Sequence, residues 1–180
     1  MCSIAPWPEV ADRESLQPQI ESILFETAGP RSFASPAELD AFRWRWLGQY
    51  QAHEPALVHL ALTPQGEVAG YVVGALADPA TSPRFAELGY FQSFAPQTAR
   101  YPAHLHINLT AHARGAGLGG RLIQAFVAAV AAAGAPGIHV VTGKTARNVG
   151  FYARNGFAEV QAITWNGRDI VMLAREVASR

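Results

Sequence analysis

The residues with the clearest chemical potential form one glycine-rich stretch. It holds four glycines within seven positions, in the order Arg114, Gly115, Ala116, Gly117, Leu118, Gly119 and Gly120. Glycine allows backbone turns in which successive amide N–H groups point into one concavity, and the positive end of a following helix also attracts anions. The stretch therefore predicts a cradle for phosphate groups. The structural alternative is a turn that only packs a strand against a helix.

The glycine-rich stretch can be compared with two nucleotide-binding motifs. Gly115, Gly117 and Gly120 satisfy the Gly-x-Gly-x-x-Gly pattern of dinucleotide-binding folds. That fold needs an acidic residue about 20 positions further on for the ribose hydroxyls. Position 140 is valine, and the next acidic residue is Glu159. A P-loop needs Gly-Lys-Ser/Thr after the glycines, and this sequence has none there. Both motifs, and with them a nicotinamide oxidoreductase, are disfavoured.

Charge is unevenly distributed along the chain. The total is zero, with 14 Lys and Arg against 14 Asp and Glu, which argues against a general nucleic-acid binder. Residues 88–158 nevertheless contain no acid and six bases: Arg100, Arg114, Arg121, Lys144, Arg147 and Arg154. This basic stretch predicts a polyanionic ligand, with a chance distribution in a charge-poor chain as the alternative.

Length and cysteine content set further limits. A chain of 180 residues fits a single domain over 1–180. The lone Cys2 excludes a disulfide framework and a cysteine-based metal site. The N-terminus lacks the basic flank and apolar run of a signal peptide, and no apolar stretch reaches the roughly 18 residues of a membrane span. We therefore expect a cytoplasmic protein with no membrane partner.

Turn residues and apolar periodicity predict the elements that position the glycine stretch. Strands are expected over 56–62, 68–77, 105–109, 138–142, 157–164 and 169–174, helices over 15–27, 35–50, 118–133 and 147–154, and at most a short edge strand in the first dozen residues. Ser35-Pro36 is a strong helix start, and Asn166-Gly167 is a strong type I′ hairpin turn. The alternation predicts an α/β (α+β) domain with a mixed sheet.

Two motifs resemble those of the GNAT superfamily of acyl-CoA-dependent N-acetyltransferases. The family's phosphate loop reads Gln/Arg-x-x-Gly-x-Gly/Ala, and Arg114, Gly117 and Gly119 fill it. A second family signature, Phe-Tyr-x-x-x-Gly-Phe, is matched by residues 151–157. The resemblance covers residues 56–174. It implies the GNAT fold, a mixed central sheet of about six to seven strands flanked by helices on both faces.

A narrower resemblance rests on a single stretch. Tyr101-Pro102, leading into the run 104–109, is similar to the acetyltransferase-like domain of eukaryotic O-GlcNAc hydrolases and its free-standing bacterial relatives. The wider family resemblance implies acetyl-CoA as cofactor, bound in a gap between the parallel strands 105–109 and 138–142. The residues it assigns to the cofactor are Ile107, Asn108, Leu109, Arg114, Gly115, Ala116, Gly117, Leu118, Gly119, Gly120, Thr145, Asn148 and Tyr152.

Tyr152 is the first catalytic candidate. It matches the family tyrosine whose hydroxyl lies near the cofactor sulfur and protonates the departing thiolate, a transfer that ordinary thiol and phenol pKa values allow. The alternative is a tyrosine that caps the core. Seven residues upstream, where the family often has Asn in contact with pantetheine, this chain has Thr145, and Asn148 falls four residues upstream.

The general base is harder to find. The common glutamate position of the family is Ala103 here. His104, His106 and Asn108 share one face of their strand by its period of two, and His106 is the candidate base because imidazole has a suitable pKa. A histidine that only packs is the alternative. Three histidines within 104–112 could indicate a metal, but no carboxylate accompanies them, so no metal is expected.

Aromatic residues mark two further regions. Trp44 and Trp46 cannot both face one core on a helix, so one of them is expected near the acceptor groove. Residues 78–100 form a long loop that contains Phe85, Tyr90, Phe91 and Phe94, and we expect this loop to be ordered and folded over the acceptor site. The alternative is that the rings complete the core while Glu87 points to solvent.

These observations lead to one function and one alternative. The chain is predicted to bind acetyl-CoA and to transfer the acetyl group to a primary amine by direct attack on the thioester. The expected acceptor is a small-molecule or peptide amine. A homodimer is one possible oligomeric state. The alternative is a pseudo-acetyltransferase that binds acetyl-CoA without transfer, because Ala103 replaces the common glutamate and acids are absent nearby.

Overall fold

The computed structural model describes residues 1–178 and contains the predicted elements in the predicted order. The strands are β1 (Ser3–Pro6), β2 (His59–Leu62), β3 (Val68–Ala75), β4 (Ala103–Leu109), β5 (Gly137–Gly143), β6 (Ala158–Trp165) and β7 (Arg168–Glu176). The helices are α1 (Gln17–Ala28), α2 (Pro36–Arg43), α3 (Gln49–His53), α4 (Ala95–Arg100), α5 (Leu118–Ala132) and α6 (Asn148–Arg154).

The strands form a mixed sheet in the order β1-β2-β3-β4-β5-β7-β6, which confirms the predicted fold class. Contacts divide the chain into two compact units. Unit 1 comprises residues 1–74 and 106–126, and unit 2 comprises residues 75–105 and 127–180. Both β4 and α5 contribute residues to each unit.

Unit 1 begins with an antiparallel arrangement of β1, β2 and β3, with β1 as the expected short edge strand. The sequence signal at Ser35 is confirmed, because the Ser35 hydroxyl accepts a hydrogen bond from the Glu38 N–H at 3.2 Å and Pro36 is the first residue of α2. Such a cap satisfies an amide that the helix itself leaves unpaired. α1 ends where Gly29 adopts a φ angle of +74°.

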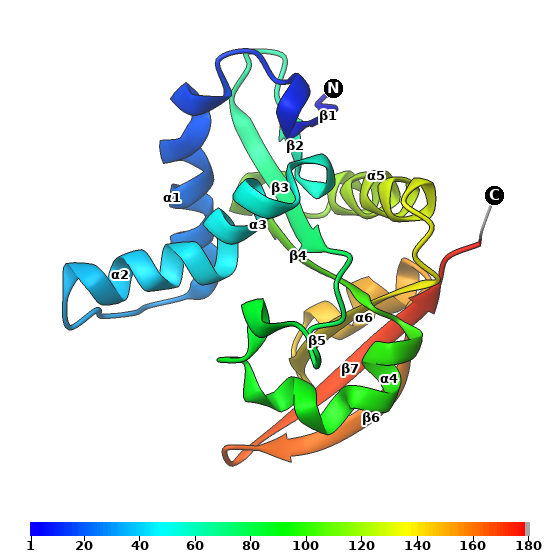
Figure 1. The fold of residues 1–180 in the computed structure, drawn as a ribbon. Helices are drawn as coiled ribbons and strands as arrows, with labels where there is room; N and C mark the ends of the chain where they lie inside the picture. Colours follow the sequence, from blue (N-terminus) through cyan, green and yellow to red (C-terminus); the bar gives the residue numbers. More distant parts are fainter. Residues whose placement is uncertain (179–180) are drawn as a thin grey trace. The chain divides into compact units, whose positions relative to one another are not determined.

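The single helix expected over 35–50 is wrong in detail. α2 ends at Arg43, a π-helical turn covers Trp44–Gly48, and α3 continues to His53 (Figure 1). A π-helical turn adds a residue to the helix and changes which side chains face inward. Leu47 is buried while Trp44 is 51% exposed. Trp44 is thus the exposed one of the two tryptophans that a helix could not direct to one core.

Unit 2 contains the strand pairs that the sequence predicted for the second half of the chain. β4 runs parallel to β5, with Ala103 opposite Ile138 and His104 opposite His139. β5 and β6 each pair antiparallel with β7. The β6–β7 hairpin turns at Asn166 and Gly167, whose φ angles of +48° and +74° fit the predicted type I′ turn.

The buried core includes apolar strand residues and an apolar stripe of α5. Leu118, Leu122, Phe126 and Val130 of α5 are buried, as their spacing predicted. No helix among residues 1–178 is long and apolar enough to cross a membrane.

Candidate functional site

The glycine stretch lies in unit 1, between the end of β4 and the start of α5. Gly115 and Gly117 have φ angles of +82° and +77°, in the left-handed region that other residues rarely adopt. A Cβ atom built on either of them would meet no atom of the described chain within 4 Å. These glycines are therefore required by the backbone conformation, and the space beside them is open.

The first turn of α5 presents backbone amides toward its N-terminal end. Its opening i to i−4 bond joins the Arg121 N–H to the Gly117 carbonyl at 3.3 Å. N–H groups before that bond have no carbonyl partner within the helix, and they carry the positive end of its dipole. The open space beside Gly115 and Gly117 and these amides fit a pyrophosphate group, so the residues present are suitable for the predicted cofactor.

Arg114 connects the glycine stretch to the end of β4. Its Nε and Nη2 atoms donate to the Leu109 carbonyl at 3.3 and 3.0 Å. Nη2 also lies 3.6 Å from the carboxylate of Glu26 on α1, and that carboxylate accepts the N–H of Ala111 at 3.2 Å. Both side chains of the ion pair are about half exposed. The guanidinium is therefore partly neutralised by an acid that the local sequence did not reveal.

The basic stretch 88–158 is free of acids in sequence but not in space. Besides the Glu26–Arg114 pair, Arg100 forms an ion pair with Glu176 at 2.5 Å. Arg121 donates to the Cys2 carbonyl at 2.8 Å. Three of the six bases thus contact partners that are distant in sequence. Folding brings acids from outside the stretch to Arg100 and Arg114, and the polyanionic ligand itself stays a prediction.

His106, the candidate base, lies on β4 in unit 1 and is half-buried. Its Nε2 atom is 3.1 Å from the hydroxyl of Tyr50 on α3. The Trp46 ring meets the imidazole edge-on, with ring centroids 5.0 Å apart and planes at 90°. Of the two tryptophans, Trp46 is therefore the one that contacts a candidate catalytic residue, while Trp44 contacts His53.

Asn108, two residues further along β4, is also bonded to a tyrosine. Its side-chain amide donates to the hydroxyl of Tyr71 on β3 at 2.9 Å. Burial raises the pKa of the Tyr71 phenol, so this hydroxyl stays protonated. β3 approaches β4 closely here, because a Cβ atom on Gly70 would lie 2.8 Å from the Asn108 carbonyl oxygen. The polar side chains of β4 in unit 1 are thus each fixed by a buried phenol.

Tyr152, the candidate proton donor, lies on α6 in unit 2 and is 6% exposed. Its ring packs against those of Phe151 and Phe157, with centroids 5.3 and 5.6 Å apart. Burial raises the pKa of its phenol, so the hydroxyl carries a proton at neutral pH. That protonation state is the one a proton donor needs, and it is equally compatible with a tyrosine that caps the core.

Thr145, which follows β5, and Asn148, which begins α6, have different surroundings. Thr145 is exposed. Asn148 is the first residue of α6, and its amide oxygen accepts a hydrogen bond from the Thr142 hydroxyl at 2.9 Å. Asn148 therefore helps to hold the start of α6. The assignment of both residues to pantetheine stays a prediction.

The first half of β4, which belongs to unit 2, is buried. Ala103, at the common glutamate position, is fully buried in unit 2 opposite Ile138. His104 and His139 are buried beside it with ring centroids 5.6 Å apart. Burial lowers the pKa of His139 to about 4, and its Nδ1 atom lies 2.5 Å from the Tyr101 carbonyl oxygen. These histidines pack in the core, and among residues 1–178 no cluster of three or more His, Cys, Asp or Glu could hold a metal.

The predicted lid, residues 78–100, is ordered and contains two 3₁₀ turns followed by α4. Phe85, Phe91 and Phe94 are buried in unit 2, where Phe85 and Phe91 contact the ring of His104. Glu87 is exposed. The three phenylalanines therefore complete the core of unit 2, as the structural alternative stated. A role of this segment in acceptor selection stays a prediction.

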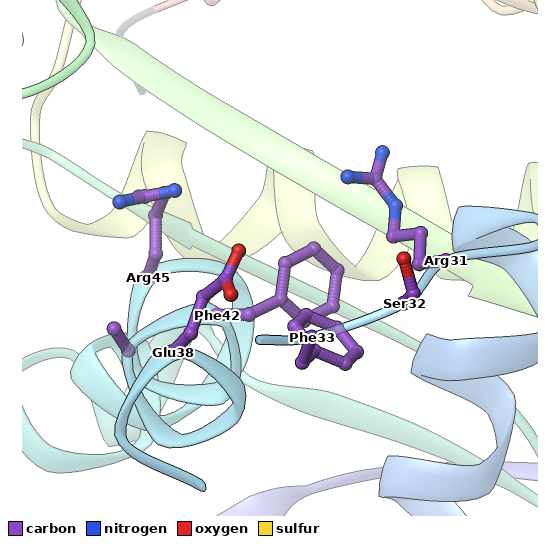
Figure 2. Close-up of a pocket in the computed structure, with 7 residues that line it drawn as sticks. Arg31, Ser32, Phe33, Glu38, Phe42 and Arg45 are labelled. Carbon is purple, nitrogen blue, oxygen red and sulfur yellow. The ribbon is translucent and has the colours of Figure 1, made fainter. Parts of the chain in front are cut away.

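Unit 1 contains a shallow pocket of about 280 Å³ beside α2. Figure 2 shows the guanidinium groups of Arg31 and Arg45 above the rings of Phe33 and Phe42, with the Glu38 carboxylate between them. The Arg31 guanidinium lies 5.1 Å from the centre of the Phe42 ring. Two cations and one acid make this surface unsuited to a polycationic ligand.

Comparison with known proteins decides the family. The model of the acetyltransferase (GNAT) family matches residues 18–157, well over half of the chain. The chain belongs to this family. The GNAT resemblance stated from the glycine stretch and from residues 151–157 is therefore confirmed, while the narrower likeness to the O-GlcNAc hydrolase domain is not shown.

Solved structures agree with this fold. SsHAT has a TM-score of 0.76 at 24% identity, over 98% of both chains. A phosphinothricin acetyltransferase of the GNAT superfamily from Sinorhizobium meliloti, solved with AcCoA, has a TM-score of 0.63 at 18% identity, over 98% of this chain and 88% of that one. A chain of the NatC complex, bound to Gag peptide and CoA, has a TM-score of 0.64 at 14% identity, over 98% and 99%.

Sequence reasoning missed three residues of this GNAT-family chain that hold site candidates in place. Glu26 pairs with Arg114, Tyr50 with His106, and Tyr71 with Asn108. Each is separated from its partner by more than 35 residues of sequence. No spacing rule could have identified these pairs, because their contact depends on how helices and strands pack.

Proposed function

We propose that this GNAT-family chain binds acetyl-CoA and transfers the acetyl group to a primary amine. The observation that carries the proposal is the open, left-handed glycine stretch at the start of α5. Membership in an acetyltransferase family supports acetyl-CoA as the cofactor, in agreement with the sequence prediction. The S. meliloti relative solved with AcCoA supports the same assignment.

The proposed binding residues follow the sequence assignment. The amides of the stretch 115–120 would hold the pyrophosphate, and Arg114 would add charge beside it. The segment 107–109 of β4 would pair with the pantetheine amides through its backbone, because an extended ligand can bond to a strand as a further strand does. Thr145 and Asn148 would contribute side-chain hydrogen bonds. We treat residues 1–180 as one acetyltransferase domain.

The proposed catalytic residues act as proton carriers. Bound acetyl-CoA would supply the acetyl group as a thioester. His106 would take the proton that the amine loses, since neutral imidazole is a suitable base near pH 7. Tyr152 would donate a proton at its hydroxyl to the departing sulfur, and its raised phenol pKa keeps that proton available.

The acceptor is proposed to be a small-molecule or peptide amine without a dense positive charge. Arg31 and Arg45 line the pocket beside α2, and a polycationic tail would be repelled there. Peptide acceptors remain within the proposal, since the NatC relative was solved with Gag peptide.

Calorimetry with acetyl-CoA tests the binding half of the proposal. Gly117→Asp places a Cβ and a carboxylate where amides would meet phosphate, so we expect at least a 100-fold loss of affinity. Gly66→Asp is the matched control, because Gly66 has a φ angle of +83° and equally open space in the β2–β3 turn. Normal binding by folded Gly117→Asp, or equal loss in both variants, would contradict the assignment of the glycine stretch.

Release of free thiol with a panel of amines tests the transfer half. We expect turnover that falls at least 10-fold in Tyr152→Phe. A protein that binds acetyl-CoA but acetylates no amine in a broad panel would instead be the pseudo-acetyltransferase, an alternative for which the comparisons give no support. That result would leave the cofactor assignment intact.

The narrower likeness to the O-GlcNAc hydrolase acetyltransferase-like domain is proposed on Tyr101-Pro102 and the run 104–109. Tyr101 lies against Gly137 so closely that a Cβ atom there would be within 3.2 Å of the Tyr101 backbone. Its carbonyl oxygen contacts His139. These residues are therefore part of the core of unit 2. We propose that the likeness reflects the same packing of this stretch in both proteins.

A further inference from the structure

The pocket beside α2 in unit 1 is lined by two aromatic rings that a third ring supports. It has a volume of about 280 Å³, and the rings of Phe33 and Phe42 belong to its lining (Figure 2). Phe42 is 7% exposed, and its ring centroid lies 5.3 Å from that of Phe33. Phe25 stacks on Phe42 at 5.9 Å and meets Phe33 edge-on at 6.1 Å. The pocket is therefore preformed, with a size near the lower limit of about 300 Å³ for small-molecule sites.

Arg31 brings two donor nitrogens without a protein acceptor to this pocket. Its guanidinium lies over the Phe42 ring, 5.1 Å from the ring centre, and its Nε atom donates to the Ala28 carbonyl at 3.1 Å. These two contacts hold the guanidinium in place. Its Nη1 and Nη2 atoms make no hydrogen bond or ion pair with residues 1–178. A guanidinium with both terminal nitrogens available can bind a carboxylate through two parallel hydrogen bonds.

Glu38 is the acid in the pocket lining, and the backbone engages its carboxylate. Its Oε2 atom accepts the Ala34 N–H at 2.6 Å, while the Ser35 hydroxyl accepts the Glu38 N–H at 3.2 Å. This reciprocal pair is a capping box at the start of α2, where the positive end of the helix also favours an acid. The Phe42 ring, which could attract a ligand cation, is already covered by Arg31. The donor nitrogens of Arg31 require an acceptor, which an anionic ligand supplies.

We propose that this pocket binds a small aromatic carboxylate. The ring of the ligand packs against Phe33 and Phe42, since aromatic rings stabilise one another in offset and edge-on contacts and lose water-exposed apolar surface. The carboxylate of the ligand accepts hydrogen bonds from Nη1 and Nη2 of Arg31. The proposal goes beyond acetyl transfer and does not depend on it, because it concerns binding alone.

Aromatic ¹H–¹³C NMR of the full chain provides the first measurement, with benzoate as the probe. We expect benzoate to shift the ring signals of Phe33 and Phe42. Benzamide has nearly the same shape without the charge, and benzylamine has the opposite charge, so each should bind at least about 10-fold more weakly than benzoate. Unchanged Phe33 and Phe42 signals with benzoate, or equal or tighter binding of benzamide or benzylamine, would overturn the proposal.

Three variants provide the second measurement. Arg31→Gln should weaken benzoate binding at least about 10-fold, because it removes the charged donors. Arg13→Gln is the matched control, since Arg13 is also an exposed arginine of unit 1 but does not line the pocket. Glu38→Gln keeps a side chain suited to the capping box and removes a repelling charge, so benzoate should bind about threefold more tightly, with a gain that decreases as salt is added. Unchanged affinity in Arg31→Gln, an equal loss in Arg13→Gln, or no gain in Glu38→Gln would contradict the site.

Discussion

Two histidines on the same strand, His104 and His106, have opposite surroundings. His104 is 2% exposed in unit 2, between the rings of Phe85 and Phe91 and beside His139. His106 is half-buried in unit 1, with a phenol hydroxyl on one nitrogen and an indole edge against its ring. Residue type and strand position are nearly the same for both.

The difference shows that the neighbours of a histidine, and not its residue type or strand alone, decide how far it is buried. A ring enclosed by aromatic side chains has no route for a proton from solvent, and the charged form is penalised by burial. A half-buried ring that a neighbouring hydroxyl helps to orient can still exchange a proton. The histidines of unit 2 therefore pack in its core, while a catalytic role of His106 stays a prediction.

The largest expected effect comes from removing a ring that packs against the buried histidines of unit 2. Phe91 is 3% exposed and contacts the rings of both His104 and His139. Phe91→Ala should lower the free energy of unfolding by about 3–5 kcal/mol, because it removes a buried ring and leaves a cavity. Urea denaturation measures this loss. Trp44→Ala is the control, since a ring that is 51% exposed should cost under about 1 kcal/mol. Equal effects would contradict the assignment of Phe91 to the core.

A second prediction concerns the pH dependence of the same cluster. Burial lowers the pKa of His139 in the folded state to about 4, below its ordinary value of about 6.5, so the unfolded chain binds the proton first as pH falls. Stability from this group is complete above pH 6.5 and is lost between pH 6.5 and about 4, by about 3 kcal/mol. Urea denaturation across this range should show the loss, and His139→Gln should reduce the slope. An unchanged slope in the variant would show that His139 titrates normally in the folded state.

The smallest expected effect on stability is at Arg114, an exposed residue of unit 1. Arg114 and Glu26 are about half exposed, and exposed ion pairs contribute only about 0–1 kcal/mol. Arg114→Ala should therefore change the unfolding free energy by no more than about 1 kcal/mol. Its effect should appear as weaker acetyl-CoA binding in calorimetry, by about threefold to tenfold, which decreases as salt is added. A loss of several kcal/mol in stability would mean that Arg114 is mainly a structural clamp.

Most of the fold was predictable because its signals are local. The cap at Ser35, the turn at Asn166-Gly167 and the apolar stripe of α5 each depend on a few neighbouring residues. Helical structure was predicted over 35–50, and residues 36–53 are helical, but the π-helical turn within them was not predicted because it has no regular period in sequence. The loop 78–100 was expected to be ordered, but its rings belong to the core of unit 2 rather than to an established acceptor surface.

The sequence by itself determined the glycine stretch, the order of strands and helices, and the family, because these depend on residue type and short spacing. Only the tertiary structure decided which side chains hold the candidate residues. Glu26 reaches Arg114, Tyr50 reaches His106, and Tyr71 reaches Asn108 across separations that no local rule spans. The physical reason is that hydrogen bonding, burial and ion pairing act over a few ångströms of space, whatever the distance along the chain.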